Sequence, residues 1–361
     1  MRLSTLVCVL PAFCLSLAPS LLGQDGAPDM SPAPQVKSFD KLLGTWNGAG
    51  TVRTSADDPG MKWTATTHNT SVLGGHFVQQ QLKIVFQGEQ APPVLAFRTI
   101  YGYDKETKKW MSYSIDNTGG TEANEIHWVN GKMMSGGSKT EMDMNGKLQF
   151  IVQRSTRTFS KNSYTIAVDQ TVGDGKHFAH VRGSFTRASA IKVASASYTA
   201  TKIPAMAPVA KQMAPVAKWH GKYRLKGWMI MAQGMPKMDI GGVEVVKSIF
   251  GGTILDLRFK GDPIPNAGSA YEGWGTISWS AHSNCYKRLY IDNVGGAVLH
   301  DLHLRDGKFV GGALLLSMGQ PVVISSVMTL NDDGSKATLS EHNAFGTSAP
   351  IHASYFTYKK Q

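Results

Sequence analysis

Cysteine is scarce in this chain of 361 residues, which contains only three. Cys8 and Cys14 lie in an apolar N-terminal stretch with the layout of a secretory signal peptide, which we predict to be cut after Gly23. The mature chain would then keep Cys285 alone, and this excludes an intramolecular disulfide. An exported protein without disulfides depends on its hydrophobic cores, so we expect domains of good size in a periplasmic or secreted bacterial protein.

Charged residues are also few, at 17%, and the net charge of +11 comes from lysines and arginines scattered along the chain. The densest basic groups, KETKK at 105–109 and the C-terminal KK, are not stripes with interleaved stacking aromatic residues, so we expect a solvated basic surface and no nucleic-acid partner. The N-terminal apolar run is interrupted by proline and lacks a following basic cluster, which favours a cleaved signal over an anchor. No transmembrane span is expected after cleavage.

Familiar catalytic and metal-binding motifs are missing. The chain has no GxSxG elbow, HExxH helix, P-loop, dinucleotide fingerprint or CxxC pair. His177 and His180 are three residues apart, as are His300 and His303. On a strand this spacing sends the two side chains to opposite faces, so neither pair forms a metal clamp by itself. We therefore predict no metal site and no required cofactor.

Two kinds of chemistry remain as lesser alternatives. A haem-binding barrel would need one axial histidine facing its cavity, for which His180, His342 and His352 are candidates. A hydrolase or isomerase would need two acids facing one cavity, and Asp116 and Glu122 are possible partners. No catalytic residue is assigned, and the sequence favours a protein that is not an enzyme.

A hexapeptide is repeated almost unchanged: IDNTGG at 115–120 returns as IDNVGG at 291–296, an offset of 176. Other short segments match at offsets of 175 to 177, and the near-constant spacing makes chance implausible. The matching pairs are 43–50 with 220–227, 71–83 with 248–260, 130–137 with 306–313, and 160–165 with 335–340. The chain therefore holds two tandem copies of one domain.

The repeat and the composition together define the domain boundaries. The stretch between the copies, AMAPVAKQMAPVAK, is rich in proline, alanine and lysine, as expected of a semi-rigid linker. The predicted parts are a signal peptide at 1–23, a disordered segment at 24–37, a first copy at 38–203, a linker at 204–218 and a second copy at 219–361.

Alternation of apolar and polar residues predicts an all-β fold in both copies. Val78, Leu82, Ile84 and Phe86 share one face of a strand, and Leu255, Leu257 and Phe259 share the matching face of the second copy. Asn-Gly and Asp-Gly turns recur between such runs, giving roughly eight to ten short strands per copy. Because closure removes sheet edges, we predict two tandem antiparallel up-and-down β-barrels. The Pro-rich linker, the short strands and a C-terminus without a closing aromatic residue disfavour an outer-membrane barrel.

The repeated hexapeptide has two interpretations. Aspartate and asparagine cap turns and glycine accepts positive φ, so turn geometry alone can explain its repetition. The predicted structural turn residues are Gly74, Gly75, Asn117, Gly119, Gly120, Gly251, Gly252, Asn293, Gly295 and Gly296. Alternatively, the two aspartates line a cavity together with aromatic residues of the same strands. The candidate ligand-binding residues are Trp110, Tyr113, Asp116, Tyr286, Tyr290 and Asp292.

The segments LLGTWNGAG, SVLGG, IYGYDKETKKWMSYSIDNTGG and NGK together resemble the bacterial domain-of-unknown-function family 1579. The resemblance covers most of the first copy, whereas the second is diverged, with Tyr223 in place of Trp46. It implies a lipocalin-like barrel. The opening GTWNGAG also looks like that of nitrobindin-type haem barrels and other calycins, which implies that Trp46 closes the barrel by packing.

These expectations converge on non-enzymatic binding of a small, largely apolar ligand in a barrel cavity. Such cavities are mostly apolar, with a few polar groups that orient the ligand. The alternative is a structural or envelope-interaction module whose barrels are filled by side chains. The oligomeric state is left open by the sequence.

Overall fold

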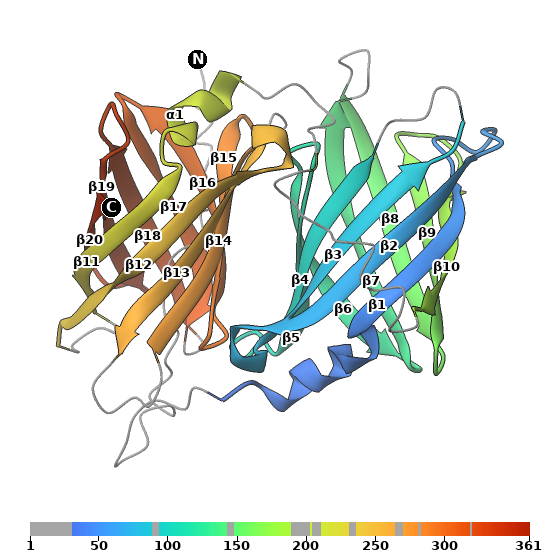
Figure 1. The fold of residues 1–361 in the computed structure, drawn as a ribbon, viewed down its shortest axis with the longest axis horizontal. Coiled ribbons are helices and arrows are strands. Elements are labelled where there is room, and N and C mark those ends of the chain that lie inside the picture. The colour runs from blue at the N-terminus through green and yellow to red at the C-terminus, as the bar shows by residue number, and fades with distance from the viewer. Residues whose placement is uncertain are drawn as a thin grey trace.

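The computed structural model describes residues 31–88, 94–142, 148–188, 203, 211–230, 236–263, 270–280, 283–317 and 320–361. These residues form two closed barrels of ten antiparallel strands each, placed side by side (Figure 1). Each strand pairs with the next along the chain, and the last pairs with the first. The predicted pair of up-and-down barrels is therefore confirmed. The expected signal peptide lies outside the described residues.

The first barrel comprises β1 (Gly44–Val52), β2 (Met61–Val72), β3 (Phe77–Phe86), β4 (Leu95–Asp104), β5 (Lys109–Asp116), β6 (Thr121–Val129), β7 (Lys132–Met142), β8 (Leu148–Phe159), β9 (Ser163–Val172) and β10 (Phe178–Arg187). The second comprises β11 (Gly221–Met229), β12 (Met238–Ile249), β13 (Ile254–Pro263), β14 (Ala270–Ser280), β15 (Cys285–Asp292), β16 (Ala297–Arg305), β17 (Lys308–Ser317), β18 (Gln320–Leu330), β19 (Lys336–Phe345) and β20 (Ile351–Lys360). The short helices are η2 (Pro34–Leu42), η3 (Leu73–Gly75), η6 (Lys211–Met213), α1 (Ala214–Ala217) and η7 (Phe250–Gly252). In the part of the chain described here, no helix has the length and apolar character needed to cross a membrane.

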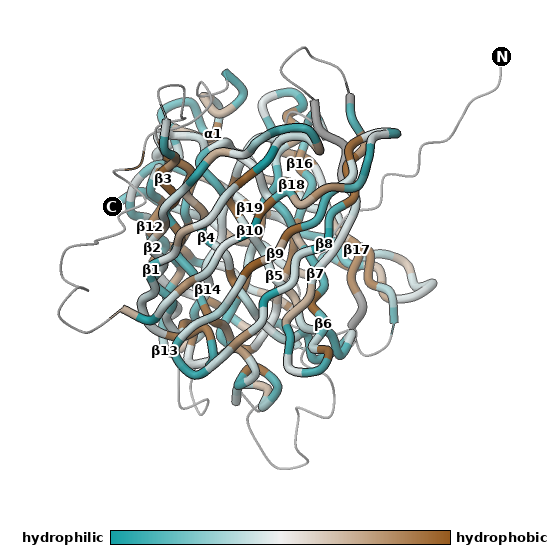
Figure 2. Tube along the Cα trace, turned by 90° about the vertical axis from the view of Figure 1, so that its right-hand side faces the viewer, coloured by the Kyte–Doolittle hydropathy of each residue, from teal (hydrophilic) through white to brown (hydrophobic). Residues whose placement is uncertain are grey.

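Apolar and polar residues follow one another along the strands of both barrels (Figure 2), and one face of these strands is buried in each barrel. In the second barrel Leu255, Leu257 and Phe259 all belong to the buried lumen core. Val78 of the first barrel, which aligns with Leu255, is likewise buried. The prediction that both copies bury the same strand face is therefore confirmed, and in the structure this face points into the lumen.

Each barrel is closed at one end by the segment that precedes its first strand. In the first barrel η2 buries Phe39 and Leu42, and the Trp46 indole donates to the Leu42 carbonyl oxygen at 2.8 Å. The Arg187 guanidinium lies 4.3 Å from the Trp46 ring centroid. Trp46 is thus a packing residue at the closed end, as the resemblance implied.

The second barrel is closed by part of the expected linker. Met213 of η6, Val216 of α1 and the following Trp219 are all about 1% exposed and belong to the lumen core. Lysine, alanine and proline in this segment pointed to a spacer, but Met213 and Val216, together with Trp219 directly after the segment, make it a plug. The first domain likewise begins earlier than expected, because η2 starts at Pro34.

The two barrels share a buried apolar interface. It joins the outer faces of β3, β4 and β5 to those of β13, β14 and β15, together with the η7 corner. Its buried residues are Phe77, Ala96, Ile100, Tyr113, Ile115, Ile203, Ile249, Phe250, Ile254, Trp274, Leu289 and Ile291. The plugs lie at opposite ends of the pair, η2 at one end and α1 at the other, as expected for an internal two-fold arrangement (Figure 1).

Polar contacts also cross this interface. Arg98 of β4 forms an ion pair with Asp256 of β13 at 2.5 Å, and both side chains are less than 10% exposed. The Trp274 indole donates to the same carboxylate. Thr121 and Ser278 form a further hydroxyl–hydroxyl hydrogen bond of 2.6 Å between the barrels.

The repeated hexapeptide is a capped turn that ties two strands together. Asp116 Oδ1 accepts the backbone N–H of Gly120 at 3.1 Å. Asn117 reaches β4, where its Oδ1 accepts from Ala96 N and its Nδ2 donates to the Val94 carbonyl oxygen, each at 2.9 Å. The turn interpretation thus accounts for this copy of the motif.

The second copy repeats these bonds at equivalent positions. Asp292 Oδ1 accepts from Gly296 N at 2.8 Å. Asn293 Oδ1 accepts from Glu272 N, and its Nδ2 donates to the Ala270 carbonyl oxygen, each at 2.9 Å. The hexapeptide therefore occurs in both copies because each barrel has the same capped turn at its rim.

Each of these turns also docks on the other barrel. A Cβ added at Gly119 would lie 3.9 Å from Thr253 Cβ, and one added at Gly295 would lie 3.3 Å from His76 Nδ1. Gly119 and Gly295 are equivalent, as are His76 and Thr253, so the two contacts are reciprocal. Both glycines have φ near +90°, a conformation that a side chain would strain.

Candidate functional site

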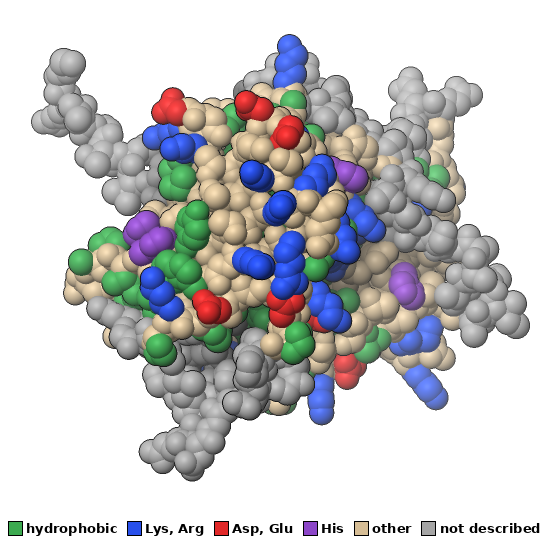
Figure 3. All heavy atoms as spheres, turned by 60° about the vertical axis from the view of Figure 1, so that its left-hand side comes forward, with side chains coloured by type: hydrophobic (Ala, Val, Ile, Leu, Met, Phe, Trp, Pro, Cys, Tyr) green, Lys and Arg blue, Asp and Glu red, His purple; other side chains and the backbone are tan. Residues whose placement is uncertain are grey.

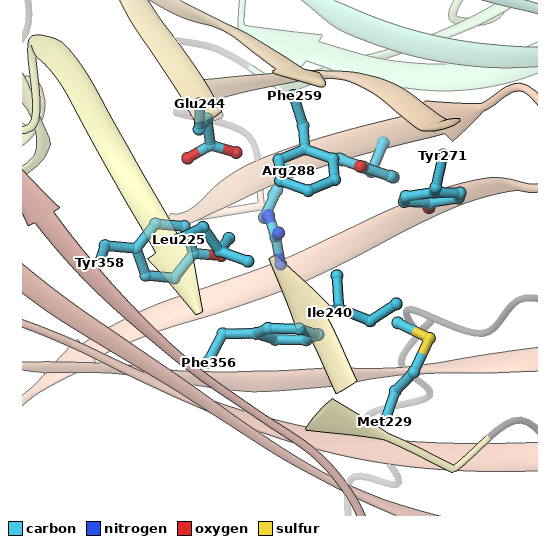
Figure 4. A pocket seen from close by; sticks show the side chains of 10 residues that line it. Leu225, Met229, Ile240, Glu244, Phe259, Tyr271, Arg288, Phe356 and Tyr358 are labelled. Carbon is cyan, nitrogen blue, oxygen red and sulfur yellow. The ribbon is translucent and has the colours of Figure 1, made fainter. Parts of the chain in front are cut away.

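A cavity lies inside the second barrel, enclosed by strands β11 to β15 and β20 (Figure 4). The cavity is small: the volume in which the centre of a water molecule fits is about 20 Å³, so it has room for one or two waters. Most of the lining side chains are aliphatic or aromatic, and two are charged. They are Leu225, Met229, Ile240, Glu244, Phe259, Tyr271, Arg288, Tyr290, Phe356 and Tyr358.

Arg288 is the cation of this lumen. It projects inward from β15 and is only 2% exposed. Its guanidinium carbon lies 5.9 Å from the Tyr290 ring centroid, and in the β15–β16 register it stands opposite His300. Gly273 provides room for the Tyr290 phenol, since a Cβ there would lie 1.8 Å from its hydroxyl oxygen.

Glu244 is the acid that lines the cavity. It projects from β12, is 3% exposed, and its Oε2 has no hydrogen-bond partner among the residues described. Burial raises the pKa of this carboxyl to about 7, although the charge of Arg288 works in the opposite direction. An unsatisfied buried carboxyl oxygen is costly, and its position beside the cavity makes it accessible to a water or ligand there.

A second buried acid, Glu341 of β19, is held by two hydroxyl groups. Ser326 donates to its Oε1 at 3.1 Å and Ser354 donates to its Oε2 at 2.8 Å. Burial raises the pKa of Glu341 to about 7, with Arg288 again opposing the shift. The side chain is 1% exposed. The lumen therefore contains a second buried carboxyl group whose pKa is near neutral pH.

His300 completes the polar centre, which we define as Glu244, Arg288, His300 and Glu341. It is fully buried, and neither ring nitrogen has a hydrogen-bond partner within the described part of the chain. Burial, with a smaller effect of Arg288, holds the pKa of His300 well below its ordinary value. The imidazole is therefore neutral and retains both a donor and an acceptor.

The rim aspartate of this barrel also faces inward. The Tyr271 hydroxyl donates to Asp292 Oδ2 at 3.1 Å, while Asp292 Oδ1 caps the turn. Burial raises the pKa of Asp292 to about 6, against the opposing effect of the backbone N–H groups. Asp292 is therefore linked to the cavity by its hydrogen bond to Tyr271, which lines it.

The six candidate ligand-binding residues do not form one group. Of these, Tyr290 lines the cavity directly. Tyr286 lies at the plugged end, where its hydroxyl donates to the Gln212 carbonyl oxygen. Asp292 lies at the other end of the same strand, because residues 286 and 292 span most of β15.

Their counterparts in the first barrel are separated in the same way. Trp110 packs at the closed end and donates to the Gln35 carbonyl oxygen at 3.2 Å, whereas Asp116 caps the turn at the opposite end of β5. Tyr113 belongs to the interface core between the barrels. Its odd position in β5 puts it on the outer face, away from Trp110 and Asp116.

None of the four polar-centre residues was identified as a site candidate from the sequence. Glu244 stands between two valines in GGVEVV, so simple alternation would place it on the outward face, whereas the structure buries it on the same face as Ile240 and Val246. Arg288 shares its strand face with Tyr290, which did signal a polar lumen. His300 was considered only with His303 as a metal pair, and the described residues contain no cluster of three or more potential metal ligands.

The first barrel has a different interior. Arg157 donates to the Tyr101 hydroxyl at 2.6 Å, and that hydroxyl donates to Gln80 Oε1 at 2.9 Å. By the repeat offset, the positions equivalent to Glu244 and Arg288 are Thr67 and Ser112. The polar centre is therefore a property of the second copy alone.

The histidines considered for haem lie elsewhere. His180 Nδ1 is 2.6 Å from the Arg53 carbonyl oxygen. His342 and His352 are exposed, pair with each other across β19 and β20, and stack with ring centroids 4.6 Å apart. None of the three lines the cavity of the second barrel.

Fold and site together define a protein of two tandem β-barrels, one of which holds a buried polar centre beside a small cavity. Residues 31–189, which comprise η2 and the first barrel, match the family described as "Protein of unknown function (DUF1579)". The resemblance of the first copy to that family is thereby confirmed. No curated protein matches the chain.

Solved structures resemble the chain only distantly. Rv2717c from M. tuberculosis is 10% identical, with 44% of this chain and 100% of that chain covered and a TM-score of 0.32. A protein of unknown function from the DUF3598 family of Nostoc punctiforme is 8% identical over 91% of this chain and 100% of that one, with a TM-score of 0.26. At such scores neither structure bears on function.

Proposed function

We propose that this chain is an exported bacterial protein that binds a small, largely apolar ligand in the lumen of its second barrel without acting on it chemically. The observation that carries the proposal is Glu244, a carboxyl that is 3% exposed, with one oxygen left without a partner in the described residues. Leaving such a group unsatisfied costs about 1–3 kcal/mol. A ligand that donates to this oxygen would recover that free energy, while its apolar part packs against the surrounding rings.

Entry of an organic ligand requires the lining to rearrange, because the cavity holds only one or two waters as it stands. Met229 ends β11 and Ile240 lies near the start of β12, so both are at the end of the barrel opposite the α1 plug. Methionine is flexible and adapts to irregular space. Displacement of Met229 is therefore the simplest way to open the lumen.

A neutral fluorescent probe, N-phenyl-1-naphthylamine, tests this proposal on the full chain. We expect saturable binding of one probe per chain that Met229→Phe weakens at least about tenfold, since the larger ring fills the entrance. The matched control is Val52→Phe, at the equivalent position of the first barrel, and it should leave binding unchanged. Equal losses in both variants, or no saturable binding, would reject the second lumen as the site.

A structural module with side-chain-filled barrels is the second candidate. The small volume of the cavity and the apolar core between the barrels favour it. Native mass spectrometry of the chain purified from its own cells, with an absorbance scan of the same sample, separates the two functions. A bound mass supports ligand binding and a Soret band identifies haem, whereas a bare chain that also fails to bind the probe supports the structural function.

A further inference from the structure

The outer wall of the second barrel carries five cations on three neighbouring strands. Lys222, Arg224 and Lys226 alternate along the outward face of β11. Lys359 of β20 stands directly opposite Arg224, and Lys336 of β19 stands directly opposite Lys359. We call these five residues the basic wall. Figure 3 shows lysine and arginine side chains gathered on this side of the molecule.

The basic wall has little compensation within the fold. Arg224 pairs with Asp262. The four lysines of the basic wall form no ion pair with a carboxylate among the described residues. Like charges directly opposite one another on adjacent strands destabilise a sheet. The alignment of Lys336, Lys359 and Arg224 is therefore unfavourable for the fold by itself, and an anionic partner would remove the repulsion.

Two aromatic residues continue the same strands. Trp228 follows Lys226 on the outward face of β11, and Tyr355 of β20 stands directly opposite it. Lys237 Nζ lies 3.9 Å from the Trp228 ring centroid, and the His352 ring meets it at 72° with centroids 4.8 Å apart. With a lysine over its face, Trp228 is poorly arranged for stacking on a nucleic-acid base.

We propose that the basic wall and the Trp228–Tyr355 pair dock this protein onto the surface of a bilayer that contains anionic phospholipid. Tryptophan and tyrosine favour the headgroup region, where the ring is buried and its polar atom stays hydrated. Lysine and arginine add attraction to anionic headgroups. Because β19, β20 and β11 are adjacent, their outward side chains share one side of the barrel and can meet a plane together.

Vesicle flotation with the full chain tests this proposal, using phosphatidylcholine with about 30% phosphatidylglycerol against pure phosphatidylcholine. Each lysine removed is expected to weaken binding about fivefold, so Lys336→Ser with Lys359→Ser should weaken it about 25-fold. The charge-matched control is Lys132→Ser with Lys161→Ser, two exposed positions of the first barrel. Tyr355→Ser tests the aromatic contribution at unchanged charge.

The expected result is binding to anionic vesicles that weakens with salt, falls in the wall variant and in Tyr355→Ser, and persists in the control. Equal losses in the wall and control variants would assign the effect to net charge and reject the site. Binding that does not depend on phosphatidylglycerol would reject the electrostatic contact. Binding to heparin or to a single-stranded oligonucleotide without binding to vesicles would replace the bilayer with a soluble polyanion.

Discussion

Removing the charge of Asp256 should uncouple the two barrels. Its carboxylate is 2.5 Å from Arg98, and the two side chains are 9% and 8% exposed. Asp256→Asn keeps the shape but leaves the Arg98 guanidinium buried without its counter-charge. Deleting one partner of a buried ion pair costs about 3–5 kcal/mol, far more than an exposed pair contributes. We expect the variant to lose stability in that range.

Equilibrium unfolding of the full chain in guanidinium chloride, followed by circular dichroism, measures this loss. The control is Asp262→Asn, whose partner Arg224 lies on the outer wall and whose own side chain is 45% exposed, so its unfolding midpoint should barely move. Asp256 Oδ2 also pairs with Arg258 Nε at 3.3 Å, so Arg98→Met, Asp256→Leu and Arg258→Met together should restore most of the stability, because no charge of this cluster is left unpaired. An Asp256→Asn chain within about 1 kcal/mol of wild type would refute the reasoning.

Three further predictions concern the lumen, the turns and the closed end. Burial raises the pKa of Glu244 and Glu341 from 4.5 to about 7, so the folded chain binds more protons than the unfolded chain between these values. The free energy of unfolding should therefore fall as pH rises through this window, by about 3 kcal/mol per group. Glu244→Gln with Glu341→Gln should remove this fall above about pH 6 in denaturant titrations, whereas Asp292, whose pKa burial raises to about 6, still contributes below it. Asn117→Ala and Asn293→Ala each remove two side-chain hydrogen bonds and should each cost about 1–3 kcal/mol, and a loss in one copy only would contradict their equivalence. Trp46→Phe loses the indole hydrogen bond and should cost about 1 kcal/mol in thermal unfolding, with no effect on probe binding in the second barrel.

The architecture was predictable because its signals are periodic. Alternation identified the buried face of β3 and β13, and the offset of the repeated hexapeptide identified the two copies. The same alternation separates Tyr113 from Trp110 and Asp116, so its place in the interface follows from parity along β5. Whether an outward face meets solvent or another barrel depends on packing, which alternation does not encode.

The polar centre was much harder to predict. Its four residues lie on β12, β15, β16 and β19, and the sequence of one strand says nothing about which residues of the other strands it meets. Which of them meet depends on strand tilt and on height within the barrel, and both are set by closure of the whole sheet. The plug of the second barrel was missed for a related reason: Met213 and Trp219 are separated in sequence and share a face only once the short helix forms.

The ion pair between the barrels has a consequence for how the copies diverged. By the repeat offset, the position equivalent to Arg98 holds Trp274, and the one equivalent to Asp256 holds Gln79. In a homodimer of identical single barrels, every substitution at this surface would appear in both subunits. An arginine–aspartate pair across the interface would then have to occur twice, once on each side of the two-fold axis. Covalent fusion removes that restriction. Each barrel can then acquire side chains that its twin lacks, while their shared surface keeps them together.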